Sequence, residues 1–192
     1  MKNKIKPIAM TAIIAFSSVS YATVEKDEKQ VNIEASKVVW KGYKVTGSHE
    51  GTIAINEGAL EFSDEKLVGG NFVIDMTTIG STDLQGEYKD KLDGHLKSDD
   101  FFGVEKYPTA SLVFTNVKAT GKNSYEVTGD ITIKGTTETI TFDLSVYGSK
   151  ANASIKIDRS KFDVRYGSTS FFDGLKDKAI YDEFDIVADL EF

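Results

Sequence analysis

The side chains best suited to chemistry near neutral pH in this sequence are its two histidines, His49 and His95. Imidazole titrates at about pH 6.5, so a histidine beside a carboxylate can act as a general acid or base, and it can also ligate a metal ion. His49 and Glu50 begin like the H-E-x-x-H motif of zinc proteases, but Ile53 occupies the position of the second histidine. No third ligand stands at a recognisable spacing, so the sequence predicts no metal site. Two interpretations stay open: an enzyme that uses His49 or His95 on a small apolar substrate, and histidines whose hydrogen bonds hold loops.

Other motifs for catalysis or cofactor binding are missing from the sequence. It contains no cysteine, which excludes disulfides, thiol catalysis, Cys-ligated zinc and iron–sulfur clusters. It contains neither glycine-rich phosphate-binding motif, and it lacks the G-x-S-x-G motif of serine hydrolases. The aspartates between positions 90 and 100 do not follow the spacing of a calcium loop and are interpreted as a solvated helix face. The sequence therefore predicts no catalytic residue and no cofactor.

Residues 1–22 have the features of a secretory signal peptide. Three lysines precede an apolar run from Ile8 to Val19, and the apolar region of a signal peptide spans roughly 7–15 residues. An N-terminal membrane anchor is the alternative, but a spanning helix needs about 20 apolar residues. Small residues at Ser20 and Ala22 predict cleavage after Ala22. The mature domain, residues 23–192, is then expected in the periplasm or outside the cell.

The charge of the chain excludes one class of partner. The 192 residues include 30 acidic and 23 basic side chains, a formal net charge of −7. Loss of the three lysines before Ala22 would leave twenty basic residues against thirty acidic ones, a charge of −10. Because an acidic chain repels phosphate, we expect no nucleic-acid binding. We also expect no stable membrane insertion after signal cleavage, and no oligomeric state follows from the sequence.

Period-2 alternation recurs along the mature chain, which is typical of strands with one buried face. The clearest case is 140–146, where Ile140, Phe142 and Leu144 alternate with polar residues. Turn signals separate the alternating runs at 56–58, 69–70, 121–123, 134–136 and 147–149. Connections this short require antiparallel neighbours. The sequence predicts a single all-β domain, an antiparallel β-barrel of about eight strands, with a β-sandwich as the alternative.

Two segments interrupt the strand pattern and are expected to cap the barrel. Residues 83–102 carry apolar side chains spaced by four, which indicates one or two short helices. Residues 168–178 hold aromatic residues among polar ones and predict a second cap, irregular or helical. The charged stretch 26–29 is expected to be the frayed start of the mature chain, and 47–51 a turn that carries His49.

An eight-stranded barrel can be filled by its own side chains or can hold one small ligand. Large residues on the apparent inward faces are the candidates for the wall of an apolar pocket: Trp40, Phe72, Ile74, Phe114, Ile133, Phe142 and Ile155. Aromatic residues of the two interrupting segments are the candidates for its lid: Phe101, Phe102, Phe171 and Phe172. The alternative is an ordinary packed core.

Residues 94–102, Gly-His-Leu-Lys-Ser-Asp-Asp-Phe-Phe, followed by Val-Glu-Lys-Tyr-Pro at 104–108, resemble the signature of the YceI-like family. Several other stretches are similar to that family as well, so the resemblance covers roughly residues 36–192. These stretches are 38–42 with 49–53, then 69–76, 131–135 and 158–162.

The resemblance implies a lipocalin-like antiparallel barrel, usually exported, whose apolar interior binds a polyisoprenoid or similar amphiphilic lipid. The G-x-W motif of lipocalins is missing, since Trp40 precedes Gly42. The polar residues of the signature imply a cap beside the pocket, with His49 and His95 as candidate contacts to the head group of the lipid. The leading hypothesis is an exported carrier that performs no chemistry. The alternatives are the enzyme described above and a ligand-free envelope stress or interaction protein.

Overall fold

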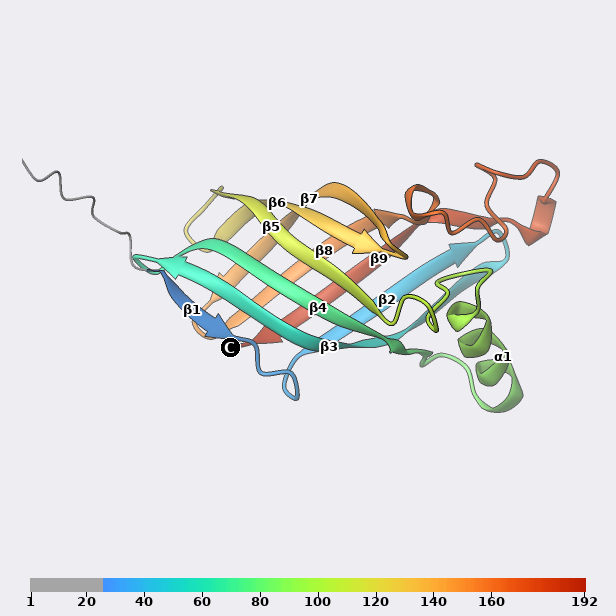
Figure 1. Ribbon diagram of the computed structural model, residues 1–192, viewed down its shortest axis with the longest axis horizontal. Helices are drawn as coiled ribbons and strands as arrows, with labels where there is room; N and C mark the ends of the chain where they lie inside the picture. The colour runs from blue at the N-terminus through green and yellow to red at the C-terminus, as the bar shows by residue number, and fades with distance from the viewer. Residues whose placement is uncertain (1–25) are drawn as a thin grey trace, which may run out of the picture.

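The computed structural model describes residues 26–192, which form one antiparallel sheet with helical segments at one end (Figure 1). The strands of this part of the chain are β1 (Asp27–Gln30), β2 (Lys37–Lys44), β3 (Gly47–Ser63), β4 (Lys66–Ser81), β5 (Thr109–Ala119), β6 (Ser124–Ile133), β7 (Thr136–Tyr147), β8 (Lys150–Asp158) and β9 (Ile180–Glu191). The helical segments are α1 (Gly86–Lys97) and the short 3₁₀ helices η1 (Arg159–Phe162) and η2 (Lys176–Lys178). The expected signal peptide and its cleavage after Ala22 lie outside the described residues.

Eight strands close into a barrel. Each strand from β2 to β9 pairs with the next one along the chain, and β2 also pairs with β9, which joins the two edges. Closure removes the free edges that the two sheets of a sandwich would have. The predicted eight-stranded antiparallel barrel is thus confirmed, and the sandwich alternative is wrong.

Strand β1 extends the sheet outside the closed barrel. Asp27 to Gln30 pair with Phe62 to Ala59 of β3, along the edge that β2 leaves free. The prediction of a frayed start at 26–29 is therefore wrong. All four β1 side chains are exposed, so this strand has no apolar periodicity that could reveal it.

The alternation of apolar and polar residues along the strands builds the core of the barrel, as predicted. In β6 and β8 every second residue is buried, and the buried set of β6 includes Tyr125, Val127, Ile131 and Ile133. Because successive strand side chains point to opposite faces, the same pattern on eight closed strands gathers the apolar side chains inside. The polar residues between them face outward.

Three predicted turn positions are wrong because the glycines there make room for aromatic rings. Residues 56–58 are a bulged part of the continuous strand β3, 69–70 lie within β4, and 47–51 begin β3. A Cβ atom on Gly58 would approach the Phe72 ring to 2.8 Å, and one on Gly70 would approach the Phe114 ring equally closely. The turn between β3 and β4 instead uses Asp64 and Glu65, both with positive φ. The turns predicted at 121–123, 134–136 and 147–149 are confirmed.

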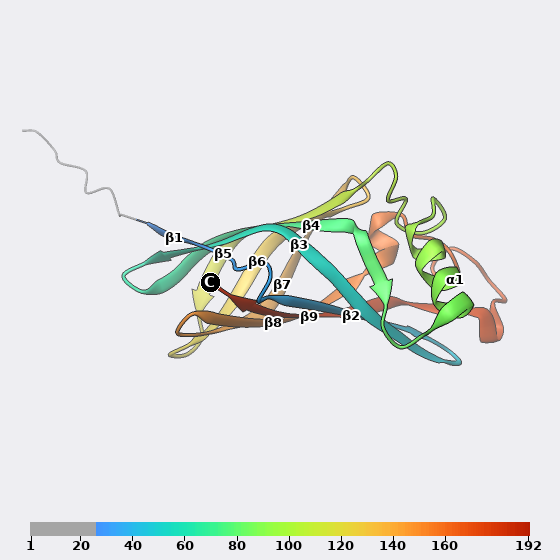
Figure 2. The same ribbon diagram turned by 90° about the horizontal axis from the view of Figure 1, so that it is seen from below.

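Helix α1 and the segment 159–179 lie at the same end of the barrel (Figures 1 and 2). The helix predicted within 83–102 is confirmed, and it packs mainly on β4. Leu96 is buried and Leu92 packs against the core, whereas Tyr88 is exposed. Residues 168–178 form an irregular loop that ends in η2, which agrees with the predicted second cap. We call this end of the barrel the capped end.

Candidate functional site

The barrel encloses an apolar cavity. All eight barrel strands contribute to its wall, and Phe102 from the loop after α1 completes it. About 130 Å³ inside is accessible to the centre of a water molecule. Ser111 is the polar residue of the lining; the others are apolar. An apolar chain inside this cavity would contact mainly apolar side chains and would meet no charged group. The cavity is narrow.

Most of the predicted wall residues line this cavity. Inward alternation brings together six that lie far apart in the sequence: Trp40, Phe72, Ile74, Phe114, Ile133 and Phe142. Ile155 is buried in the core but does not line the cavity. Small neighbours account for the space: Ala153 on the same strand and Ala188 on β9 do line it.

The predicted lid residues occupy three different environments. Phe102 lines the barrel cavity, while Phe101 is buried beside it, with ring centroids 5.0 Å apart. Phe171 and Phe172 lie on the surface of the capped end, 39% and 50% exposed. The guanidinium group of Arg165 lies 5.0 Å from the centre of the Phe171 ring. Phe102 therefore forms part of the cavity wall with Phe101 packed beside it, whereas Phe171 and Phe172 are partly exposed at the capped end and do not line the barrel cavity.

Fifteen apolar residues that line the cavity were not among the predicted wall or lid residues. They are Val38, Ile53, Ile55, Met76, Ile79, Ala110, Leu112, Ile131, Leu144, Ala153, Ile157, Phe184, Ile186, Ala188 and Leu190. A signal for most of them was present, because they share the alternating face of the residues that were chosen. The pattern marks which face points inward, but it does not show which of the inward side chains border free space.

Trp40 is held in the wall by a glycine on the neighbouring strand. Trp40 pairs with Gly51 in the β2–β3 register, and a Cβ atom on Gly51 would lie 2.6 Å from the indole ring and 1.9 Å from the carbonyl oxygen of Gly80. The indole is 7% exposed, and its Nε1 donor has no hydrogen-bond partner among the described residues. Trp40 is the one tryptophan in the sequence, so its fluorescence reports on the cavity.

A carboxylate fastens α1 to the end of β4. The Asp93 carboxylate accepts hydrogen bonds from the backbone N–H and the hydroxyl of Ser81, at 2.7 and 2.8 Å. Lys89 donates to the other oxygen of Asp93 at 2.6 Å and to the Ser81 carbonyl. Burial raises the pKa of Asp93, but the bonds from Lys89 and Ser81 outweigh it and lower the pKa below the usual aspartate range. The ionised carboxylate thereby stabilises the capped end.

A buried arginine anchors the loop between η1 and β9. Arg159 is 2% exposed, and its guanidinium group donates to the carbonyl oxygens of Val164, Tyr166, Ile180 and Tyr181 at 2.9–3.2 Å. Asp182 lies 3.3 Å from the same group and balances its charge. Burial lowers the pKa of Arg159, which nevertheless stays charged because arginine does not deprotonate in proteins. The group also lies over the Phe101 ring, so it connects the loop to the residues beside the barrel cavity.

The two histidines lie on separate elements, and neither lines the barrel cavity. His49 on β3 makes a 2.8 Å hydrogen bond to Asp83. Burial raises the pKa of Asp83, but the bond to His49 and the backbone bond from Glu50 lower it overall. His95 on α1 packs edge-on against Phe101 and Tyr166, with centroid distances of 5.5 and 4.3 Å. Both histidines thus have contacts that position the cap, and residues 26–192 contain no cluster of three side chains able to hold a metal ion.

Comparison with known proteins gives a consistent family. The family model described as "YceI-like domain" matches residues 23–192. A UPF0312 protein of Pseudomonas putida strain F1 is 35% identical over 98 residues, which are 51% of this chain and 49% of that protein. The UPF0312 protein plu2095 of Photorhabdus laumondii is 37% identical over 98 residues, 51% of this chain and 48% of the relative. The chain therefore spans about half the length of the curated relatives it matches.

Solved structures share the fold. The crystal structure of BcnA from Burkholderia cenocepacia superposes with a TM-score of 0.66 at 24% identity, over 83% of this chain and 98% of that one. The YCEI protein of Campylobacter jejuni gives a TM-score of 0.55 at 16% identity, over 95% and 92%. A polyisoprenoid binding domain from Saccharophagus degradans gives 0.56 at 14% identity, over 84% and 95%. At these identities the likeness shows the barrel fold of the chain.

Proposed function

Because this chain belongs to the YceI-like family, we propose that it is an exported lipid-binding protein that holds the tail of a polyisoprenoid or similar amphiphilic lipid inside its barrel. The observation that carries the proposal is the apolar cavity inside the closed barrel, with Trp40 and Phe102 in its wall. The Saccharophagus degradans domain of the same fold is described as polyisoprenoid binding, which supports the same ligand class. The signal-peptide features of residues 1–22 support export. Among residues 26–192, no helix is long and apolar enough to cross a membrane.

The energetics of the cavity suit a ligand with a long apolar tail. Burial of one CH₂ group contributes about 0.8 kcal/mol, so each five-carbon isoprene unit gains roughly 3–4 kcal/mol before ordering costs. The space that a water-sized sphere can reach is only about 130 Å³, so a tail of several units must displace wall side chains as it enters. Met76 is suited to such movement because its unbranched side chain adapts to irregular space.

The geometry favours binding over catalysis as the role of this site. An enzyme acting in the cavity would need a titratable group facing the substrate, and the lining supplies only the hydroxyl of Ser111. His49 and His95 contact Asp83 and aromatic rings instead. A double variant, His49→Ala with His95→Ala, is therefore expected to retain lipid.

The direct test is extraction of purified mature protein with organic solvent, followed by mass spectrometry. We expect a lipid at a stoichiometry near one when the protein comes from native membranes or has been incubated with prenyl lipids. Protein that carries no stoichiometric lipid after either treatment would contradict the proposal and favour the ligand-free alternative.

A matched pair of variants on β8 tests whether the cavity is the binding site. Ala153 lines the cavity and Ser154 is exposed on the outer face of the same strand. Ala153→Phe is expected to fill the cavity and lower lipid occupancy at least fivefold, whereas Ser154→Phe is expected to leave it unchanged. Thermal unfolding of both variants shows that they are folded. Equal occupancy in the two folded variants would place the lipid elsewhere.

A further inference from the structure

The wall of the barrel has a groove on its outer face, where β3 passes between the start of β2 and the last part of β4. It offers about 230 Å³ to the centres of water molecules, and we call it the side groove. Its lining comes from these strands and from the segment before β2: Ile33, Ser36, Lys37, Val38, Thr52, Ile53, Ala54, Ile55 and Thr78. Val38, Ile53 and Ile55 also line the barrel cavity. A single layer of residues therefore separates the side groove from the barrel cavity.

Strand pairing is interrupted on one edge of β3 beside this groove. Pairing of β2 with β3 ends at Val38 and Ile53, and β1 pairs with β3 only from Ala59 onward. None of the described strands pairs with residues 54–58 of β3 on this edge. The connecting segment 31–36 lies along the gap and supplies part of the lining of the groove.

Pairing is interrupted on the other edge of β3 at the same level. Residues 76–79 of β4 bulge out opposite Ile53, so the register shifts between Thr52 and Ala54. Figure 2 shows the bend of β4 near its C-terminal end. A side-chain bond helps to hold this place, because the backbone N–H of Ala54 donates to the hydroxyl of Thr78 at 2.8 Å. Segments with few backbone hydrogen bonds open more readily than well-paired strands.

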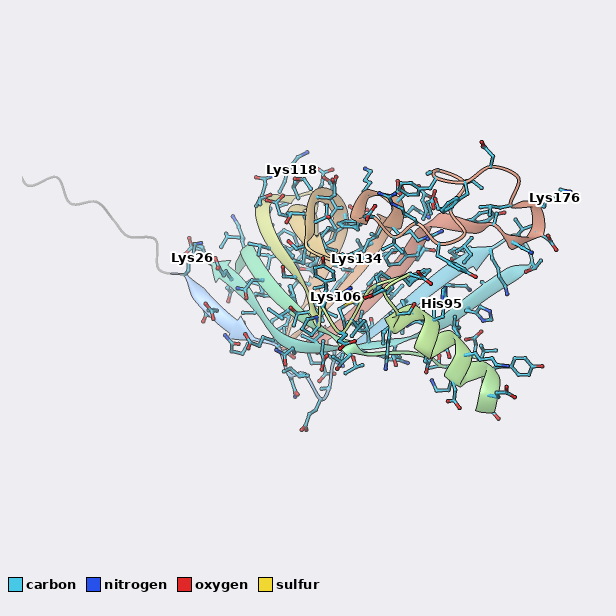
Figure 3. All side chains as sticks on the ribbon, turned by 45° about the vertical axis from the view of Figure 1, so that its right-hand side comes forward. Lys26, His95, Lys106, Lys118, Lys134 and Lys176 are labelled. Atoms are coloured by element: carbon cyan, nitrogen blue, oxygen red, sulfur yellow. The ribbon has the colours of Figure 1, made fainter. Side chains whose placement is uncertain are left out.

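Both ends of the barrel are filled by buried side chains. Figure 3 labels His95 at the capped end and Lys26 near the opposite end. At the capped end Phe102 is 7% exposed, and helix α1 is fastened to β4 through its carboxylate. At the opposite end Phe62 is 5% exposed, and its ring packs against that of Phe192 with centroids 5.6 Å apart. A ligand that entered from either end would have to displace these packed rings.

From these observations we infer that the tail of the lipid enters and leaves the barrel sideways, through the side groove. The inference rests on the proposed function. The tail passes between segment 31–38 and residues 53–55 of β3, where no strand pairing has to be broken on the β2 edge. Ile33, 42% exposed at the groove, offers it an apolar contact outside the barrel. The polar head group stays in water during entry, which avoids the cost of moving it through the apolar interior.

This route has a kinetic consequence. A group that narrows the side groove raises one barrier, which the tail crosses in both directions. Association and dissociation are then slowed by the same factor, and Kd is unchanged. A change inside the cavity, such as Ala153→Phe, raises Kd instead.

The test uses single cysteines, which can be labelled selectively because the sequence contains none. Ala54→Cys places a thiol in the side groove, Ser154→Cys places one on the outer face of β8, and Phe172→Cys places one on the surface of the capped end. Each variant is labelled with benzyl methanethiosulfonate and mixed with retinol. Retinol is an isoprenoid alcohol whose absorption overlaps tryptophan emission, so energy transfer from Trp40 reports its uptake. Dissociation is followed by dilution into phosphatidylcholine vesicles.

The label at residue 54 is expected to slow both rates at least fivefold, with Kd within twofold, and removal of the label by dithiothreitol is expected to restore the rates. The labels at 154 and 172 are expected to leave both rates within twofold. Unchanged rates with the label at 54, slower rates with the label at 172, or a changed Kd without equal changes of both rates would overturn the route and leave the proposed function standing. Retinol that binds neither the variants nor the wild type would contradict the proposed function itself.

A matched pair of threonine variants tests the same route by loosening the wall. Thr78→Val removes the hydroxyl that accepts from the Ala54 N–H, and Thr139→Val removes a hydroxyl that bonds to Asp130 on the outer face of the barrel. Both threonines are exposed. Thr78→Val is expected to speed both rates at least threefold with Kd within twofold, and Thr139→Val is expected to leave them unchanged. Equal rates in the two variants, both shown to be folded by thermal unfolding, would overturn the opening of the wall at this place.

Discussion

Replacement of Arg159 by methionine tests whether one buried side chain holds the cap. Methionine keeps most of the apolar stem and removes the guanidinium group, which donates to four backbone carbonyls and faces Asp182. The side chains of Arg159 and Asp182 are only 3% and 14% exposed, so solvent screens this pair little. The variant leaves the Asp182 charge and the carbonyl groups without their donor.

The expected cost follows from that burial. Removal of one partner of a buried ion pair costs about 3–5 kcal/mol, because the remaining charge stays desolvated. For a domain of this size, 1 kcal/mol corresponds to roughly 2–4 °C in Tm, so the melting temperature is expected to fall by about 6–20 °C. Local opening of the loop would limit the global loss, since the freed groups could then reach water.

Two measurements distinguish global from local loss of structure. Urea unfolding gives the free energy, and hydrogen exchange followed by mass spectrometry shows whether protection is lost first in residues 163–181. Arg165→Met is the matched control, because Arg165 lies on the same loop with a 58% exposed side chain. Its exposed ion pair is expected to contribute no more than about 1 kcal/mol. Arg159→Met with the stability and exchange pattern of the wild type would refute the argument that Arg159 anchors the cap.

Three further predictions concern the cavity wall and the helix. Gly51→Ala is expected to destabilise the barrel by at least about 2 kcal/mol in urea unfolding, because the added methyl group meets the backbone of Gly80 and the indole of Trp40. Gly42→Ala, where no atom lies within 4 Å of the added group, should cost far less. Lipid entry is expected to change the emission of Trp40, and an unchanged spectrum at saturating lipid would exclude it from the contact surface. Asp93→Asn is expected to cost about 1–2 kcal/mol at pH 7. Because the folded-state pKa of Asp93 is lowered, its contribution is complete above the usual aspartate pKa. It is lost as pH falls through the lowered value, so the stabilities of wild type and variant should converge below that pH.

Much of the fold could be predicted because alternation is a local signal. Runs such as Ile140, Phe142 and Leu144 identify an inward face without knowledge of the partner strands, and turn residues such as Lys134 and Gly135 mark short connections. The predictions that were wrong concern glycines. Gly58 and Gly70 are typical turn residues, but here each makes room for an aromatic ring that reaches over from a neighbouring strand. The identity of that ring depends on register, which is not a local property.

The candidate site was predictable in part for a similar reason. The wall residues share the inward face, so Trp40 and Phe142 could be chosen from the pattern. Ile155 lies on the same alternating face, but it is packed in the core and does not border the cavity. Free space next to an inward side chain depends on the sizes of all the side chains that surround it in the barrel. Arg159 could not be singled out, since its hydrogen bonds go to backbone carbonyls up to 22 residues away in the sequence.

The sequence by itself determined the class of this protein: an acidic, cysteine-free chain with alternating strands, the features of a signal peptide and the YceI-like signature around residues 94–108. These properties follow from composition and from short-range periodicity, which a single chain displays before it folds. Only the tertiary structure decided that the barrel closes and that its interior keeps a narrow apolar space. Each of these depends on contacts between residues far apart in the chain. Closure and free volume depend on all such neighbours together, and no single stretch of sequence contains them.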